Sequence, residues 1–149
     1  NSEGLLMTGL LVEENGGFIS CCSPVFSPPI DLSTYQGINI DIDGFGKTLK
    51  LAISCTERFP LINALSFDQR KWVFEFTTHQ KGTTNVQIPF RLFKPSIRSR
   101  PLQGDIKFRT NSICQFQVLY SKFGMPGQLN NEFKPGPINI LVRSLYAYT

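Results

Sequence analysis

The amino-acid sequence predicts an all-β domain, and three observations support this class. Phe, which suits half-buried pleated surfaces, occurs 13 times, while Gly (12) and Pro (10) punctuate short elements. Apolar and polar residues alternate in several short runs. These runs recur every ~8–12 residues with turn signals between them, as in a β-sandwich or barrel. The length of 149 residues fits one domain over residues 1–149, and no amphipathic helix of three turns is visible.

The first two strands are predicted at residues 5–12 and 18–23. Between them lies an Asn15-Gly16 step, which adopts positive φ at little cost, so the two strands are expected to form a hairpin. Prolines then interrupt regular structure over residues 24–29, because each removes a hydrogen-bond donor. Residues 31–35 are expected to form a single helical turn.

The next two strands are predicted where Ile alternates with Asn or Asp over residues 38–43, and where Leu or Ile alternates with smaller or charged residues over 49–54. A turn at residues 43–46 separates them, so the second is expected to be the partner of the first. Further strands are predicted at residues 61–67, 72–76, 84–89, 113–121 and 138–148.

Two long stretches, residues 90–109 and 122–137, are predicted to be irregular loops, and loops of this length are usually functional or disordered. The first is basic: its cations face one acid, Asp105, and Phe90, Phe93 and Phe108 are interleaved with them. These cations are Arg91, Lys94, Arg98, Arg100, Lys107 and Arg109. The pattern fits docking to an anionic protein or lipid-headgroup surface, nucleic-acid binding, or a solvated loop anchored by its Phe residues.

The second loop contains Phe123 and Met125 in a Gly- and Pro-rich setting. Either these side chains fold back over the sandwich, or they form an exposed recognition patch.

Signals for catalysis, metals and cofactors are weak. Gly44-Phe45-Gly46-Lys47-Thr48 lacks the first glycine of a phosphate loop and precedes a strand. His79 is expected in a solvated turn, and Asp41 and Asp43 on the solvent face of a strand. The four cysteines are expected to be reduced thiols, and their spacing does not fit a zinc site. We expect no enzyme activity and no cofactor.

The net charge of +4 and pI near 9.0 permit an anionic partner without requiring one. No apolar stretch approaches the ~20 residues that a membrane-spanning helix needs, so any membrane association is expected to be peripheral.

A set of short motifs resembles the complex I intermediate-associated protein family in order and spacing, from about residue 9 to the end. The motifs are Gly17-Phe18-Ile19-Ser20-Cys21, residues 23–33, Tyr35-Gln36-Gly37-Ile38, Ser66-Phe67-Asp68, Ile88-Pro89-Phe90, Ser121-Lys122-Phe123, Leu129-Asn130, Gly136-Pro137 and Tyr146-Ala147-Tyr148. The resemblance implies a galactose-binding-like jelly-roll β-sandwich, akin to carbohydrate-binding modules, in which the domain is not an established catalyst.

Two positions depart from the family pattern. Cys22 stands where relatives commonly carry Arg, and residues 57–60 replace a Trp-Asp-Gly-type sequence. The segment from Ser121 to Pro137 is similar to the branch found in photosynthetic organisms, some of whose members are linked to photosystem biogenesis. The mitochondrial branch assists complex I assembly.

The resemblance therefore implies a non-catalytic docking domain for a membrane electron-transport complex, with a photosystem favoured and complex I second. Its expected place is peripheral, on the stromal or cytoplasmic side of the thylakoid membrane, in a reducing compartment. The expected contact residues are Arg91, Lys94, Arg98, Arg100, Lys122 and Phe123. An RNA-binding module and a carbohydrate-binding module, the latter with Trp72 and Tyr35 as candidate platforms, remain alternatives, and an enzyme would need a Rossmann part outside this chain.

Overall fold

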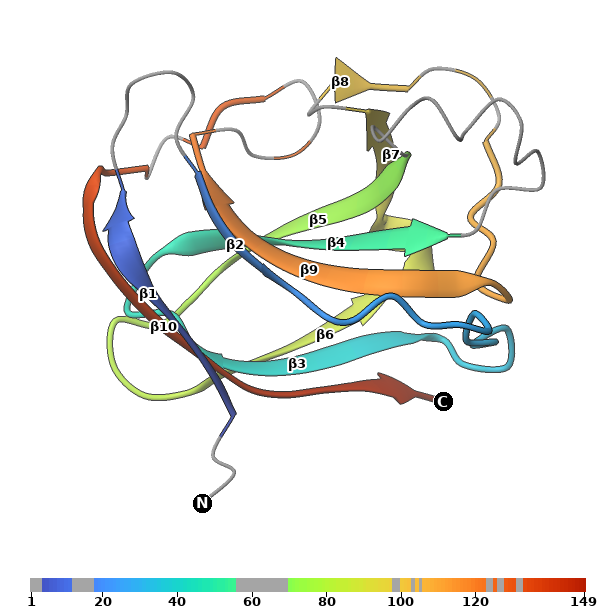
Figure 1. Ribbon diagram of the computed structural model, residues 1–149, viewed down its shortest axis with the longest axis horizontal. Helices are drawn as coiled ribbons and strands as arrows, with labels where there is room; N and C mark the ends of the chain where they lie inside the picture. Colours follow the sequence, from blue (N-terminus) through green and yellow to red (C-terminus); the bar gives the residue numbers. More distant parts are fainter. Residues whose placement is uncertain are drawn as a thin grey trace.

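The structure, a computed structural model, is a sandwich of two antiparallel sheets packed face to face (Figure 1). It describes residues 4–11, 18–55, 70–97, 100–102, 104, 106–122, 125, 128–130 and 133–149. The elements are β1 (Leu5–Leu11), β2 (Phe18–Cys22), β3 (Gly37–Asp43), β4 (Thr48–Cys55), β5 (Lys71–Thr77), β6 (Thr84–Pro89), the 3-10 helix η1 (Phe90–Leu92), β7 (Lys94–Ile97), β8 (Arg100–Pro101), β9 (Ile113–Ser121) and β10 (Gly136–Tyr148). The predicted all-β class is confirmed.

Sheet A has four strands in the order β1-β10-β3-β6, and sheet B has six in the order β2-β9-β4-β5-β7-β8. Neighbouring strands in both sheets are mostly distant in sequence, so each surface described below combines residues from distant parts of the chain. In the part of the chain that is described, no helix is long and apolar enough to cross a membrane.

The core lies between the sheets and is built from the alternating residues that the sequence indicates. Ile38, Ile40 and Ile42 of β3 face Leu49, Leu51 and Ile53 of β4, and each of the six is at most 1% exposed. Burying a side chain of this size stabilises the fold by about 1.5–3 kcal/mol relative to leaving it in water. The period-two pattern therefore predicted these two strands and their inner faces correctly.

The predicted hairpin between the first two strands is wrong, although both strands exist. β1 pairs with β10, where Met7 is opposite Ile140, and β2 pairs with β9, where Ile19 is opposite Tyr120. The chain changes sheets between β1 and β2, because each strand completes the edge of a different sheet and buries apolar side chains there. The Asn15-Gly16 step lies outside the described residues.

The expected partnership of β3 and β4 is also wrong. A tight turn, in which Phe45 (φ 53°) and Gly46 (φ 85°) have positive φ, carries the chain from sheet A to sheet B instead of closing a hairpin. β4 then pairs with β9 on one side and β5 on the other. All eight residues of β4 are buried, so its second face is covered as well.

The prediction of one irregular loop over residues 90–109 is wrong in part, because η1, β7 and β8 lie within it. β7 extends sheet B through pairing of Val73 with Lys94. Residues 31–35 form a turn closed by the Tyr35 N–H, which donates to the Leu32 carbonyl at 3.0 Å, but no helix. The strand predicted at residues 61–67 lies outside the described residues.

Candidate functional site

The candidate site lies on the outer face of sheet B, the face turned away from the core. Leu49, Leu51 and Ile53 point into the core, so Lys50, Ala52 and Ser54 lie on this outer face. The register places Lys50 between Leu119 of β9 and Glu75 of β5, and Ala52 between Gln117 and Val73. The central strand β4 thus presents one buried lysine and two small residues toward this face.

Four polar side chains meet there, and we call them the Lys50 cluster: Lys50, Lys71, Glu75 and Gln117. The Nζ atom of Lys71, on β5, donates a hydrogen bond of 2.5 Å to Oε1 of Gln117, on β9. β4 lies between these two strands, and Ala52 is the residue opposite Gln117. A methyl group at this position leaves room for the Lys71 side chain to cross the strand.

Lys50 is a buried cation without a hydrogen-bond acceptor among the described residues. It is 6% exposed, and burial lowers the pKa of its ammonium to about 8, with the nearby Glu75 raising the pKa and Lys71 lowering it. Across the strand, the Oε2 atom of Glu75 is buried and has no hydrogen-bond partner. Buried polar groups are normally hydrogen-bonded, so the buried Oε2 atom of Glu75, opposite Lys50 in the register, is unusual in having no partner.

The loop after β9 crosses the same end of sheet B. The Nδ2 atom of Asn130 donates to the carbonyls of Thr48 (3.0 Å) and Ser121 (3.2 Å), which ties the loop to β4 and β9. The Sδ atom of Met125 accepts a hydrogen bond from the Glu75 N–H at 3.2 Å, which brings the loop to β5. For Met125, the fold-back alternative is therefore confirmed; Phe123 lies outside the described residues.

The predicted contact residues do not form one compact cluster. Arg91 is exposed in η1 and Lys94 is exposed on β7, whereas Lys122 is half-buried just after β9. β4 and β5 lie between β9 and β7, so Lys122 is separated from Lys94 by two strands. Arg98 is outside the described residues, and only the backbone of Arg100, at the start of β8, is described.

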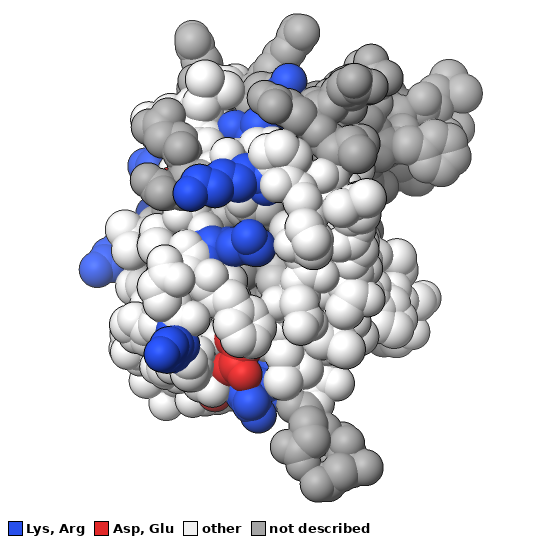
Figure 2. Space-filling model, turned by 90° about the vertical axis from the view of Figure 1, so that its left-hand side faces the viewer, with Lys and Arg blue, Asp and Glu red and all other residues white. Residues whose placement is uncertain are grey.

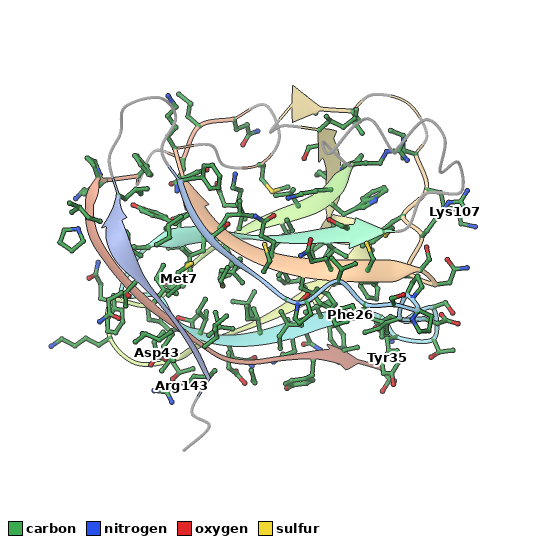
Figure 3. The ribbon with its side chains drawn as sticks, viewed as in Figure 1. Met7, Phe26, Tyr35, Asp43, Lys107 and Arg143 are labelled. Carbon is green, nitrogen blue, oxygen red and sulfur yellow. The ribbon has the colours of Figure 1, made fainter. Side chains whose placement is uncertain are left out.

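The aromatic residues of the basic segment turn inward. Phe93 is 3% exposed and Phe90 and Phe108 are half-buried, with Phe108 stacked on Trp72 at a centroid distance of 4.5 Å and an interplanar angle of 4°. The neighbouring Lys107 and Arg109 are exposed, and Figure 3 shows Lys107 projecting from the end of the sandwich. The anchoring role considered for these Phe residues is confirmed, and Trp72, 6% exposed, offers no surface for a sugar ring.

Sheet A carries an ion pair where the solvent face of β3 was expected. Arg143 of β10 donates from Nη2 to Oδ2 of Asp43 at 2.7 Å and from Nε to both carboxylate oxygens at 3.1 Å (Figure 3). Hydrogen bonds from Arg143 and Thr83 lower the pKa of Asp43. Asp43 is 8% exposed, so the expectation of a solvent-facing position is wrong for this residue.

Asp41 also has protein partners: Ser144 donates to its carboxylate at 2.7 Å, and Asn85 donates at 2.5 Å. These bonds, that of Asn85 foremost, lower the pKa of Asp41. Within the described ranges, no group of three His, Cys, Asp or Glu residues is placed to hold a metal ion.

The remaining sequence predictions concern His79 and the cysteines. His79 is exposed in the turn after β5, as expected. Cys21, Cys22, Cys55 and Cys114 are not joined by disulfides, as expected for reduced thiols. Figure 2, which looks onto the side where β1 and β10 lie, shows basic side chains gathered in its upper part and only a small acidic patch below them.

In the described residues, two antiparallel sheets with a single short 3-10 helix form a β-sandwich of the jelly-roll, galactose-binding-like type, a fold that solved carbohydrate-binding modules share. The family 11 carbohydrate-binding module of the cellulosomal cellulase Lic26A-Cel5E of Clostridium thermocellum matches with a TM-score of 0.59 at 16% identity, covering 99% of this chain and 84% of that chain. The structure of the Clostridium thermocellum family 11 module with a β-1,3-1,4-mixed-linked tetrasaccharide matches with a TM-score of 0.54, also at 16% identity, covering 99% and 85%. At this identity the likeness establishes the fold alone.

The chain belongs to the complex I intermediate-associated protein 30 (CIA30) family, whose model matches residues 1–142. An uncharacterized protein of Schizosaccharomyces pombe is 27% identical over 111 residues, which cover 72% of this chain and 49% of the relative. The chain thus spans about half the length of the curated relative that it matches. The family resemblance is confirmed, whereas the photosynthetic branch stays a prediction.

Proposed function

We propose that this domain is a non-catalytic protein-binding domain that assists assembly of a membrane-bound electron-transport complex. The observation that supports this proposal is the match to the CIA30 family over residues 1–142, because the family description names a complex I intermediate. Complex I is therefore the first complex to test. A photosystem, which our sequence analysis favoured, is the second, and it rests on the similarity of residues 121–137 to the photosynthetic branch.

The exposed cations of the basic segment support a docking role. Arg91, Lys94, Lys107 and Arg109 are exposed, whereas the Phe residues between them pack inward. Exposed cations whose aromatic neighbours are packed against the core steer association with an acidic surface. We place the partner contact on this segment, and we retain Arg98, Arg100, Lys122 and Phe123 as predicted contact residues.

The test is native purification of the tagged chain from membranes of its source, followed by mass spectrometry of the co-migrating proteins. We expect complex I subunits or, for the photosynthetic alternative, photosystem subunits. The variant carrying both Arg91→Glu and Lys94→Glu is expected to recover about tenfold less partner, because reversed charges repel an acidic surface. Lys81→Glu, in the turn between β5 and β6, is the control, since Lys81 is equally exposed and lies outside the basic segment.

A second double variant, Arg98→Glu with Arg100→Glu, tests the rest of the predicted surface in the same way. A chain that migrates alone would contradict the assembly role, and co-purified RNA or glycan would favour the binding-module alternatives. Unchanged recovery with both double variants would remove the basic segment as the contact while leaving the assembly role open to another surface.

A further inference from the structure

The Lys50 cluster leaves hydrogen-bonding capacity unused at a buried position. An ammonium has three donors, and none of those on Lys50 bonds a described residue. Lys71 uses one of its donors on Gln117, and the buried Oε2 atom of Glu75 accepts none. Lys50 is 6% exposed and Gln117 9%, so little water reaches the cluster; Oε2 of Glu75 is fully buried, whereas the Lys50 ammonium keeps contact with solvent.

We propose that the Lys50 cluster binds a small oxyanion that also carries a hydroxyl group, of the phosphate or hydroxycarboxylate class. The oxygens of such a ligand accept hydrogen bonds from the ammonium groups of Lys50 and Lys71. Its hydroxyl donates to Oε2 of Glu75. The ligand thereby gives the buried acceptor on Glu75 a donor while its anionic oxygens bind the two ammonium groups, which neither a simple cation nor an anion without a hydroxyl can do.

Charge favours an anion over a neutral or cationic ligand. Two lysines and one glutamate give the cluster a net charge of about +1 when all three are ionised. A charge-assisted hydrogen bond from a partly buried ammonium is about twice as strong as a neutral one. The pairing of Lys50 with Glu75 across β4 and β5 fixes the relative positions of donor and acceptor, because both side chains stand on rigid strands.

The surroundings of the cluster favour a small charged ligand over a neutral sugar. The positions in register with it are Leu119, Val73, Ala52 and Ser54, none of which is aromatic. A sugar ring would find no platform for stacking among these neighbours.

The first experiment is a titration of the full chain with inorganic phosphate and with sulfate at pH 7, followed by amide NMR shifts and calorimetry. Phosphate retains a P–OH hydrogen at this pH, whereas sulfate has none. We expect phosphate to shift the amide resonances of β4, β5 and β9. We also expect it to bind at least about tenfold more tightly than sulfate, because sulfate has no hydroxyl to donate a hydrogen bond to Glu75 and repels its carboxylate. Absence of shifts in these strands with phosphate would overturn the proposal.

Matched variants separate this site from general electrostatics. Lys50→Met is expected to weaken phosphate binding by about tenfold or more, since it removes the unpaired ammonium at nearly constant length. Glu75→Gln is expected to raise sulfate affinity and so reduce the preference for phosphate. Lys81→Met, at an exposed lysine in the turn between β5 and β6, is the control and is expected to leave affinity within about twofold.

Equal effects of Lys50→Met and Lys81→Met, or an unchanged phosphate preference in Glu75→Gln, would overturn the assignment. Thermal unfolding of each variant checks that it is folded.

A further titration with glucose 6-phosphate and with citrate distinguishes the two ligand classes. Tighter binding of glucose 6-phosphate assigns a phosphomonoester, and tighter binding of citrate assigns a hydroxycarboxylate. These measurements do not depend on the assembly role, so either proposal can fail while the other stands.

Discussion

The side chain of Lys71 reaches Gln117 across the whole width of β4, through a 2.5 Å hydrogen bond between residues 46 positions apart. The crossing depends on Ala52, the small residue that β4 presents opposite Gln117. Lys71, Ala52 and Gln117 come from three different strands, β5, β4 and β9. The hydrogen bond can therefore form only when these three strands are in the register described above.

Ala52→Leu tests this arrangement. Ala52 is 2% exposed, so a larger side chain has no free space and must displace the Lys71–Gln117 bond. We expect a loss of about 1–3 kcal/mol in the free energy of unfolding, the usual effect of overpacking, measured by urea denaturation. Ala52→Ser, which adds only a hydroxyl, is the control. Equal stability of Ala52→Leu and the wild type would show that the side chain of Lys71 does not cross at this point.

Lys50→Met is expected to be more stable than the wild type at pH 7 and below. Burial lowers the pKa of Lys50 from 10.5 to about 8, so the unfolded chain binds more protons than the folded chain between these values. Wild-type stability is then expected to rise with pH from about 8 to 10.5, while the variant lacks this rise. The stability difference, a few kcal/mol at pH 7, should shrink as the pH approaches 10. Denaturation curves at several pH values measure it, and a constant difference would contradict the assigned burial of the charge.

Removal of the Asp43–Arg143 pair is expected to destabilise the domain mainly above pH 4. Hydrogen bonds from Arg143 and Thr83 lower the pKa of Asp43, so the stabilisation is present above its unfolded value and is lost as pH falls through the lowered folded value. The Arg143 side chain is 40% exposed, which limits the expected coupling to about 1 kcal/mol. A double-mutant cycle with Asp43→Asn and Arg143→Gln at pH 7 and at pH 3 checks this. Equal coupling at both values would contradict an ionic contribution.

Phe108→Leu is expected to destabilise the domain by about 1–2 kcal/mol and to change the fluorescence of Trp72. The chain has a single Trp, so its emission reports directly on the stack with Phe108 at 4.5 Å. Phe45→Leu, at an exposed turn position, is the control for general effects of removing a ring. Unchanged emission in Phe108→Leu would show that the basic segment is not anchored through this ring.

Local sequence patterns predicted most strands because alternation is a local property. Ile38, Ile40 and Ile42 must share one face of any strand that contains them, whatever that strand pairs with. The same rule marked Trp72 of β5 as a core residue, and it is 6% exposed. The short strand β7 escaped prediction because Pro95 and only four residues leave little pattern to detect.

The candidate site was harder to predict for a physical reason. The alternation marks Lys50, Glu75 and Gln117 as polar positions, but polar positions on a strand are usually solvated. Their burial depends on the tertiary structure, in which β4 lies in the middle of sheet B. A run of alternating residues does not show which strands pair with it or what packs over its outer face.

The sequence by itself determined the all-β class, the inner faces of β3 and β4, and the family, and it offered the anchoring of aromatic residues in the basic segment as one of three alternatives. Each of these follows from the period of side chains along a strand or from short motifs read in order. Only the tertiary structure decided that β1 pairs with β10, that β2 pairs with β9 and that β3 and β4 belong to different sheets. It also brought Lys71 to Gln117 and left Lys50 buried, because strand pairing and loop packing depend on residues far apart in the chain.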